Sequence, residues 1–353
     1  MTTDGVTVFS IVNKPCVSYI CYGETEQLGS KLYPSHGGAI DANLPIQKVR
    51  LSGLTAGKRY YYRIVSKEIT QYQPYKVVYG DSVISPLQPF TLPRADVERF
   101  SFLAFNDVHS QPAFIDTVCK RFPDIDFVCY NGDILSDIRN EQDIVTNLCN
   151  ASAKAFAGSK PFLYVRGNHE TRGAASRSLM SYIENPENEY YYNFKWGNTQ
   201  FLVLDTGEDK EDTHPVYAGL ADYDPYRSKQ AEWLKTVIAS KVWKKAKHRV
   251  ALSHIPASSQ GDGWHGTNEV AQKLLPVLNS ANIDMYLCGH THEAVLERPD
   301  KNHAFALVIG GGPVYDKSGI GTTYIRVIVD GKQAKIELYK KDGTLYDSYL
   351  TGN

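Results

Sequence analysis

The chain has 353 residues, of which 42% are hydrophobic and 22% charged, and its formal net charge is -1 at pH 7. This length exceeds one typical domain, so we expect two hydrophobic cores. Because the charge is nearly balanced, the protein has no net positive potential that would attract nucleic acid. No run of residues approaches the roughly 20 apolar residues of a membrane span. We therefore predict neither a nucleic-acid partner nor a membrane span.

Residues 1–94 contain strand-like runs separated by turn residues and show no helical period of apolar residues. The runs are residues 6–12, 17–23, 46–54, 59–66, 75–80 and 89–93. This pattern predicts a small antiparallel β-sandwich domain. Within it, Leu54, Gly57 and Tyr60 resemble the tyrosine corner of fibronectin type III domains, with a generic hairpin as the alternative. The polar stretch 93–99 predicts a boundary, giving domains at residues 1–94 and 95–353.

Beyond residue 99, apolar strand-like runs alternate with helix-like segments. The expected strands are 100–105, 127–130, 162–165, 250–253 and 285–288, and the expected helices are 113–122, 142–156, 227–240 and 270–281. The tail returns to strands at 304–310, 322–330, 332–340 and 344–350. This order predicts an α/β catalytic domain in which helices cover two sheets, the second partly antiparallel.

Short polar clusters follow five of these strand-like runs. They contain Asp107 and His109, Asp133, the trio Asn168, His169 and Glu170, then His254, and finally His290 and His292. Because ligands bind at the carboxyl ends of strands in open α/β sheets, we expect these side chains to converge.

The converging side chains offer oxygen and imidazole nitrogen without thiolate, which suits two divalent ions such as Mn, Fe or Zn. Two such cations, only partly neutralised by Asp107, Asp133 and a bridging hydroxide, leave a positive pocket for a phosphoryl group. We therefore predict hydrolysis of a phosphate ester, with Asp133 bridging the metals and His169 as general acid.

Three further residues are candidates for contact with substrate. Arg166 could bind phosphate or form a structural salt bridge, and His265 lies in a loop that could reach substrate. Glu170 could orient His169 or only shape the turn.

Residues 100–353 resemble the calcineurin-like metallophosphoesterases, whose motifs DxH, GD, GNH[DE], H and GHxH occur here in order as DVH, GD, GNHE, His254 and GHTH. The resemblance implies a four-layer α/β/β/α sandwich. It further implies two metal sites that share Asp133, one completed by Asp107, His109 and His292, the other by Asn168, His254 and His290.

The N-terminal module and the segment GHTHEAVLER are similar to purple acid phosphatases. Those enzymes carry a tyrosine three residues after the bridging aspartate and no histidine in the first motif, whereas this chain has Ser136 and His109. We therefore expect no tyrosinate-to-iron colour.

Phosphomonoesters are the first expectation for the substrate. A phosphodiesterase or nucleotide hydrolase would use the same residues, and a third reading is an adhesion or carbohydrate-binding protein with a vestigial site. The N-terminal domain is a candidate for docking or dimer contacts.

The six cysteines form no CxxC pair and leave the redox compartment open. The N-terminus lacks signal-peptide features, but proteins that join these modules are commonly exported. We therefore favour export over the cytoplasm, with a signal absent from this chain.

Overall fold

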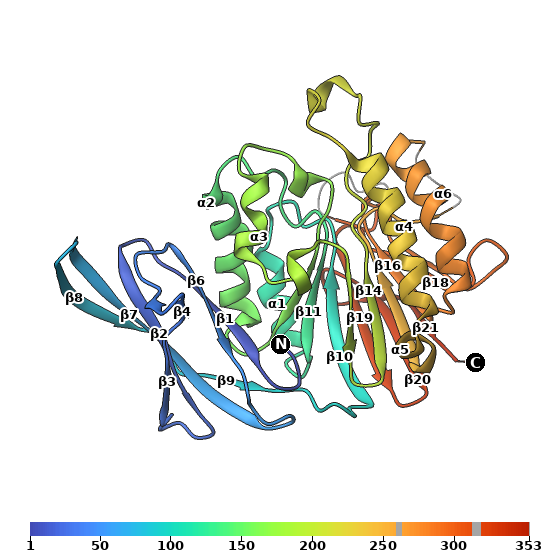
Figure 1. Ribbon diagram of the computed structural model, residues 1–353. Helices are drawn as coiled ribbons and strands as arrows, with labels where there is room; N and C mark the ends of the chain where they lie inside the picture. Colours follow the sequence, from blue (N-terminus) through green and yellow to red (C-terminus); the bar gives the residue numbers. More distant parts are fainter. Residues whose placement is uncertain (259–262, 313–318, 353) are drawn as a thin grey trace. The chain divides into compact units, whose positions relative to one another are not determined.

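A computed structural model describes residues 1–258, 263–312 and 319–352 (Figure 1). The chain divides into two compact units, one formed by Met1–Ala95 with Gly158–Lys160 and the other by Asp96–Ala157 with Pro161–Asn353. The predicted boundary after residue 94 lies beside this division. That each unit is an independent domain stays a prediction.

The first unit is built from strands. Their bounds are β1 (Val6–Ile11), β2 (Cys16–Gly23), β3 (Ser30–Leu32), β4 (Ser35–His36), β5 (Ala39–Ile40), β6 (Ile46–Leu51), β7 (Arg59–Gln73), β8 (Lys76–Ile84) and β9 (Gln88–Thr91). Strand β1 pairs with β6, and a second sheet has the order β3-β2-β7-β8, with β9 also paired to β7. The all-β character expected of this part is confirmed.

Tyr60 lies in the core of the first unit, where its ring is 5.6 Å from that of Phe90. Its hydroxyl accepts a hydrogen bond of 2.9 Å from the backbone N–H of Thr55, five residues upstream. A tyrosine corner makes this kind of backbone contact. The fibronectin type III assignment itself stays a prediction.

The second unit contains two six-stranded sheets. The first has the order β12-β11-β10-β19-β20-β21, and its strands are β10 (Arg99–Phe105), β11 (Phe127–Asn131), β12 (Phe162–Val165), β19 (Thr323–Asp330), β20 (Gln333–Lys340) and β21 (Leu345–Leu350). Strands β10, β11 and β12 run parallel, whereas β19, β20 and β21 add antiparallel strands.

The second sheet has the order β13-β14-β15-β16-β18-β17. Its strands are β13 (Tyr192–Trp196), β14 (Thr199–Val203), β15 (His248–Leu252), β16 (Met285–Cys288), β17 (Val295–Glu297) and β18 (Ala306–Ile309). Strands β14, β15, β16 and β18 are parallel neighbours. Aromatic side chains fill the space between the two sheets, where the ring of Phe102 lies 5.8 Å from that of Phe201.

Helices cover the outer faces of both sheets (Figure 1). They are α1 (Ala113–Arg121), α2 (Glu141–Ile144), α3 (Leu179–Tyr182), α4 (Tyr223–Ala239), α5 (Lys241–Lys245) and α6 (His265–Ser280). Apolar residues of α4 and α6 form one core with those of the second sheet, while Phe114 of α1 packs on Phe105 of the first. The α/β/β/α sandwich is therefore confirmed. Among the described helices, none combines the length and apolar character needed to cross a bilayer.

Three expected helices differ from those in the structure: the segment 142–156, helix α4, and helix α6, which begins at His265 and not at residue 270. The segment 142–156 is not one α-helix, because α2 ends at Ile144 and π-helical turns follow at Val145–Asn150 and Ala153–Ala157. Helix α4 begins earlier than expected because the carboxylate of Asp212 accepts hydrogen bonds from the backbone N–H groups of Tyr223 and Asp224, at 2.8 and 2.9 Å. This cap comes from a distant loop residue, so no local pattern predicts it.

Candidate metal centre

Seven predicted metal ligands follow strands that end at one edge of the two sheets. Three strands of the first sheet (β10, β11, β12) and two of the second (β15, β16) run parallel within their sheets and are each followed by at least one of them. The ligands are Asp107, His109, Asp133, Asn168, His254, His290 and His292. The convergence expected from the sequence is therefore observed in the geometry of the second unit.

Five of these seven residues have backbone angles in the left-handed region, where residues other than glycine are strained. The φ values are 51° for Asp107, 47° for His109, 53° for Asp133, 71° for His290 and 58° for His292. Such strain persists only where the surrounding structure imposes it, and it concentrates at functional sites.

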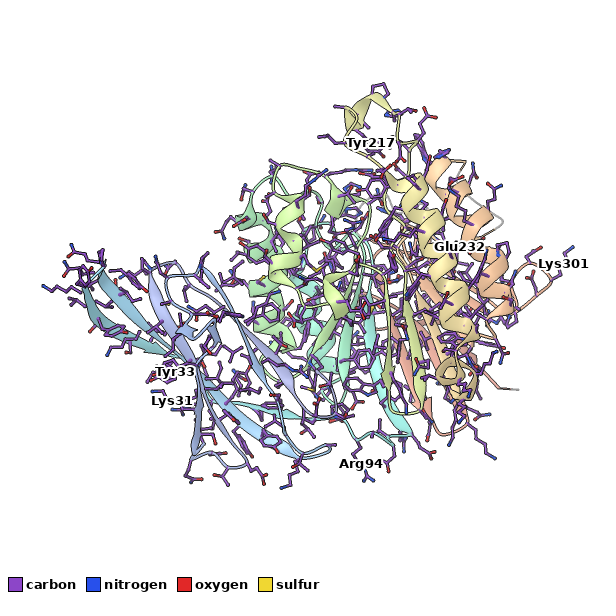
Figure 2. The ribbon with its side chains drawn as sticks, in the orientation of Figure 1. Lys31, Tyr33, Arg94, Tyr217, Glu232 and Lys301 are labelled. Carbon is purple, nitrogen blue, oxygen red and sulfur yellow. The ribbon has the colours of Figure 1, made fainter. Side chains whose placement is uncertain are left out.

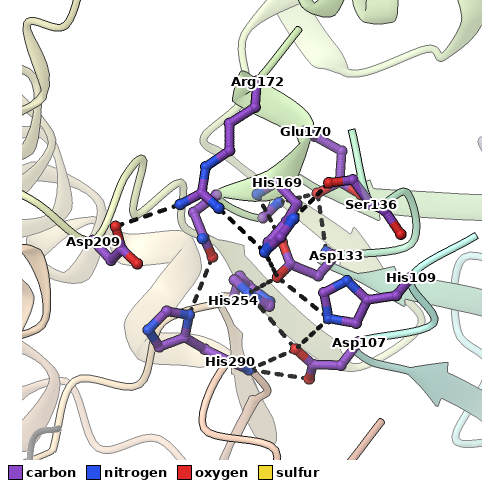
Figure 3. A network of polar contacts seen from close by, with 12 residues as sticks. Asp107, His109, Asp133, Ser136, His169, Glu170, Arg172, Asp209, His254 and His290 are labelled. Atoms are coloured by element: carbon purple, nitrogen blue, oxygen red, sulfur yellow. Dashed lines mark hydrogen bonds and ion pairs between the residues drawn. The ribbon is translucent and has the colours of Figure 1, made fainter. Parts of the chain in front are cut away.

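A first cluster of donor atoms is formed by Asp107, His109 and His292. Figure 3 shows Asp107 and His109 of this cluster beside Asp133. The Nε2 atoms of His109 and His292 lie 3.1 Å apart, and Nε2 of His292 lies 3.3 Å from Oδ1 of Asp107. The Nε2 atom of His109 is also 3.9 Å from Oδ2 of Asp133.

A second cluster lies on the other side of Asp133. The Nε2 atom of His254 is 3.1 Å from Oδ2 of Asp133, and Nδ1 of His290 is 3.1 Å from Oδ1 of Asn168. His254 is fully buried, and its Nε2 atom makes no hydrogen bond in spite of this proximity. A buried nitrogen without a hydrogen bond, beside a carboxylate, suits a bound cation.

The distances within both clusters suit metal coordination. Ligand atoms at about 2.1 Å from a divalent cation lie roughly 3.0 to 3.5 Å from one another. The separations of 3.1 and 3.3 Å fall in this range. Oδ2 of Asp133 lies near donors of both clusters, and His254, Asp107 and Asp133 form a second group of donor atoms close enough to share a cation.

The electrostatics of the clusters are set by burial and by the two aspartates. Burial lowers the pKa of His109 to about 4, against the opposing effect of Asp133. Burial would also lower the pKa of His254, but Asp133 and Asp107 outweigh it and raise that pKa to about 9. Burial likewise opposes ionisation of Asp133, yet the surrounding histidines hold its pKa well below the ordinary value. Asp133 therefore stays ionised between the two clusters, where it can attract a cation.

Glu170 is fully buried and braces the loops that carry the ligands. Its Oε2 atom accepts hydrogen bonds from the backbone N–H groups of Asp133 (2.9 Å) and Gly167 (2.8 Å). Its Oε1 atom accepts from the backbone N–H of Leu135 (2.9 Å) and from the hydroxyl of Tyr164 (2.9 Å). Burial and the neighbouring Asp133 raise the pKa of Glu170. This geometry favours the turn-shaping role over contact with substrate.

Glycines of the motifs allow the ligand loops to approach one another. A Cβ atom on Gly132 would lie 2.3 Å from Nδ1 of His254, and one on Gly289 would lie 2.4 Å from Oδ2 of Asp107. A Cβ on Gly312, which follows β18, would lie 2.2 Å from the carbonyl oxygen of Asp107. Gly312 belongs to no predicted motif, although the run of three glycines at 310–312 marks a close approach of backbone.

His169 is held at both ring nitrogens (Figure 3). Its Nδ1 atom lies 2.5 Å from the carbonyl oxygen of Ser136, which can only accept, so Nδ1 carries a proton. Its Nε2 atom lies 3.9 Å from Oδ2 of Asp133 and 3.2 Å from Nη1 of Arg172. Nε2 is thus the ring nitrogen that faces the candidate metal centre.

The other two candidate contact residues are engaged in ion pairs. Arg166 contacts Asp205 through Nη2 (2.5 Å) and Nε (3.3 Å), and its guanidinium stacks on the ring of Tyr190 at 3.9 Å. The expected loop position of His265 is wrong, because His265 is the first residue of helix α6, and its Nε2 atom lies 2.9 Å from Oδ2 of Asp224. For Arg166 this geometry favours the structural alternative.

Sequence reasoning missed two asparagines that join the sheets beneath the site. The Nδ2 atom of Asn106 donates to the carbonyl of Cys288 (2.6 Å), and that of Asn131 donates to the carbonyl of Leu287 (3.0 Å). Each asparagine precedes a motif at the end of an apolar run, and this position was the available signal. It also missed Arg172, Glu208 and Asp209, which no motif contains.

Comparisons with known proteins agree with this geometry. Residues 100–294 match the family model described as calcineurin-like phosphoesterase. Purple acid phosphatase 3 of Arabidopsis thaliana is 28% identical over 216 residues, which cover 56% of this chain and 56% of that protein. The chain thus spans just over half the length of this curated relative.

Two solved structures share the fold at low sequence identity. Purple acid phosphatase PPD1 from yellow lupin (Lupinus luteus) seeds superimposes with a TM-score of 0.70 and 15% identity, covering 99% of this chain and 72% of that chain. PhoD gives a TM-score of 0.63 and 15% identity, covering 99% of this chain and 90% of that chain.

Proposed function

The chain belongs to the calcineurin-like phosphoesterase family, and we propose that it is a binuclear metal-dependent hydrolase of phosphomonoesters. The observation that carries this proposal is the position of Asp133 between two clusters of donor atoms, at 3.1 Å from His254 and 3.9 Å from His109. Both distances are to Oδ2 of Asp133, so this one carboxylate can be shared by a pair of cations.

In this proposal each cluster holds one cation. Asp107, His109 and His292 hold the first, Asn168, His254 and His290 hold the second, and Asp133 is shared. When bound, two divalent cations activate a water molecule as nucleophile and stabilise the charge on the phosphoryl oxygens. Their identity among Mn, Fe and Zn is open, and Ser136 and His109 predict that the tyrosinate-to-iron colour is absent.

His169 is proposed as the general acid. The carbonyl of Ser136 fixes the proton on Nδ1 and turns Nε2 toward the candidate metal centre. Because Nδ1 already carries a proton, His169 can donate from Nε2 only as the imidazolium, with a second proton taken up before the ester bond breaks. That proton then passes to the departing ester oxygen, which leaves as an alcohol. Asp133 supports this geometry, because one of its carboxylate oxygens accepts a hydrogen bond of 3.0 Å from the backbone N–H of His169.

Two assays test the function against its alternatives. Protein loaded with Mn²⁺ or Zn²⁺ should hydrolyse 4-nitrophenyl phosphate faster than bis(4-nitrophenyl) phosphate, and the reverse order would favour a phosphodiesterase or nucleotide hydrolase. Elemental analysis should find two cations per chain. Fewer than one after reconstitution would favour an adhesion or carbohydrate-binding protein with a vestigial site.

Export of the protein and a docking or dimer role for the N-terminal unit belong to the same proposal. The fold match to purple acid phosphatase PPD1 supports the association of the two units, because it covers 99% of this chain. Fractionation of the source cells, and the mass of the protein in solution with and without residues 1–94, would test these two points.

A further inference from the structure

Arg172 places one nitrogen of its guanidinium at the edge of the candidate metal centre. Its Nη1 atom lies 3.2 Å from Nε2 of His169, which is itself 3.9 Å from Oδ2 of Asp133 (Figure 3). The Arg172 side chain is 31% exposed, so solvent reaches it. The positively charged guanidinium of Arg172 therefore lies near Asp133, the carboxylate that would be shared by the two metal ions.

The rest of the guanidinium is held by two carboxylates. Nε and Nη2 of Arg172 donate to Glu208 at 3.0 and 2.7 Å, and Nη2 also lies 3.4 Å from Asp209. The Glu208 side chain is only 2% exposed and accepts further hydrogen bonds from the hydroxyls of Thr171 (2.6 Å) and Tyr217 (3.0 Å). Tyr217 comes from the segment between β14 and α4 (Figure 2). These contacts fix the arginine and leave Nη1 directed at the site.

A phosphoryl oxygen of the substrate could replace His169 as the hydrogen-bond acceptor of Arg172. A guanidinium can only donate, so Nε2 of His169 acts as the acceptor in this pair. An anionic phosphoryl oxygen is a stronger acceptor for an arginine N–H than a neutral imidazole nitrogen. Nη1 carries two N–H groups in the plane of the guanidinium, so it can donate to a phosphoryl oxygen without moving while Nε and Nη2 stay on Glu208. A phosphoryl oxygen that replaces the imidazole as the acceptor also frees Nε2 of His169.

Arg166 does not offer the same possibility. Its Nε and Nη2 atoms bind Asp205, a fully buried residue, and its face is covered by the ring of Tyr190. Among the contacts of the described residues, Arg172 is the arginine that touches a residue of the candidate site directly.

We propose that Arg172 binds the phosphoryl group of the substrate through Nη1 and that Glu208 positions it for this contact. This inference rests on the proposed function, because it assigns a phosphate-binding residue to the same site. The planar guanidinium, held on one side by Glu208 and Asp209, keeps Nη1 for recognition of a phosphate dianion.

The test is calorimetric titration of the Mn²⁺-loaded protein with inorganic phosphate, which requires no turnover. Arg172→Gln should raise the Kd for phosphate about 10- to 100-fold, as expected for a lost charge-assisted hydrogen bond, and should keep the metal content of the wild type. Glu208→Gln should raise the Kd less, because the arginine remains but is held more loosely. Arg298→Gln is the matched control, since Arg298 makes a similar two-point ion pair with Asp347 at 2.8 Å on the surface.

An unchanged Kd in Arg172→Gln with both metals bound would overturn the inference, and so would an equal rise in Arg298→Gln. If Arg172→Gln does not fold, Arg172→Lys decides, because lysine keeps the charge but has no fork to bind Glu208 and phosphate together. A Kd at least 5-fold higher than wild type supports the assignment in that variant, and an unchanged one overturns it. A wild type that binds phosphate but hydrolyses no ester would refute the proposed function and leave the assignment of Arg172 decided by these titrations.

Discussion

Replacing Glu170 with glutamine should destabilise the loops that carry the candidate metal ligands. The carboxylate of Glu170 accepts four hydrogen bonds of 2.8 to 2.9 Å, three from backbone N–H groups and one from the hydroxyl of Tyr164. Glutamine has one oxygen and one NH₂ group, so it cannot accept all four. In its best orientation the hydroxyl of Tyr164 turns to accept from the new NH₂ group, and the backbone N–H of Leu135 loses its acceptor.

The magnitude follows from these contacts. A buried N–H left without an acceptor costs about 1 to 3 kcal/mol, and each hydrogen bond to the carboxylate that becomes neutral loses roughly 0.5 to 1 kcal/mol. With one N–H left unpaired and two backbone hydrogen bonds weakened, the free energy of unfolding should therefore fall by about 2 to 5 kcal/mol. For a unit of this size the melting temperature would fall by roughly 10 °C.

Thermal unfolding of metal-free Glu170→Gln and wild type measures this loss. Glu232→Gln is the control, because Glu232 is an exposed residue of α4 (Figure 2) that pairs with Lys235. Loss of this exposed ion pair should change the free energy of unfolding by less than about 0.5 kcal/mol. A melting temperature of Glu170→Gln equal to that of wild type would refute the reasoning. It would mean that the buried group is the protonated acid, which glutamine mimics.

Three further predictions concern the site and the pH dependence of stability. Asp133→Asn should lose both metals and all hydrolysis because the shared carboxylate is gone, and elemental analysis that finds two cations in this variant would contradict the bridging role. His169→Asn should keep both metals yet lower kcat roughly 100- to 10,000-fold on alkyl phosphates, whose leaving groups need a proton, and a full rate on an alkyl phosphate would exclude it as the general acid. Asp284, 3.4 Å from His248, raises the pKa of that histidine above 6.5, so its stabilisation is complete below that pH and is lost as the pH rises through the raised value. His248→Gln should therefore lower the melting temperature more at about pH 5.5 than at about pH 9, and an equal loss at both would argue against the ion pair.

The arrangement of the candidate ligands was predictable because each follows a short apolar run. Once Phe105, Asn131 and Val165 end parallel strands of one sheet, the residues after them must meet at the same edge. The β-branched and aromatic content of those runs was enough to place the strands. The pattern of apolar runs and the polar residues that follow them were therefore enough to predict most of the candidate metal ligands.

The choice between the two arginines was not predictable. Arg166 and Arg172 both flank the motif at 167–170, and only tertiary contacts show that the first binds Asp205 while the second reaches His169. Glu208 resembles a solvated loop residue in the sequence, yet folding buries it under Arg172 and Tyr217. The pairings of Arg166 with Asp205 and of Arg172 with Glu208 join residues 39 and 36 positions apart, so they leave no periodic signal.

The start of helix α4 illustrates the same limit. Asp212 caps it from a loop 11 residues before Tyr223, so the helix extends beyond the segment that its apolar spacing predicts. Neither propensity nor spacing contains information about a cap supplied from outside the segment.

Anomalous scattering from crystals loaded with Mn²⁺ tests the account most directly. We predict two peaks on either side of the Asp133 carboxylate, one within coordination distance of Asp107, His109 and His292 and the other of Asn168, His254 and His290. A single peak, or ions bound only elsewhere, such as between Asp224 and His265, would contradict the account.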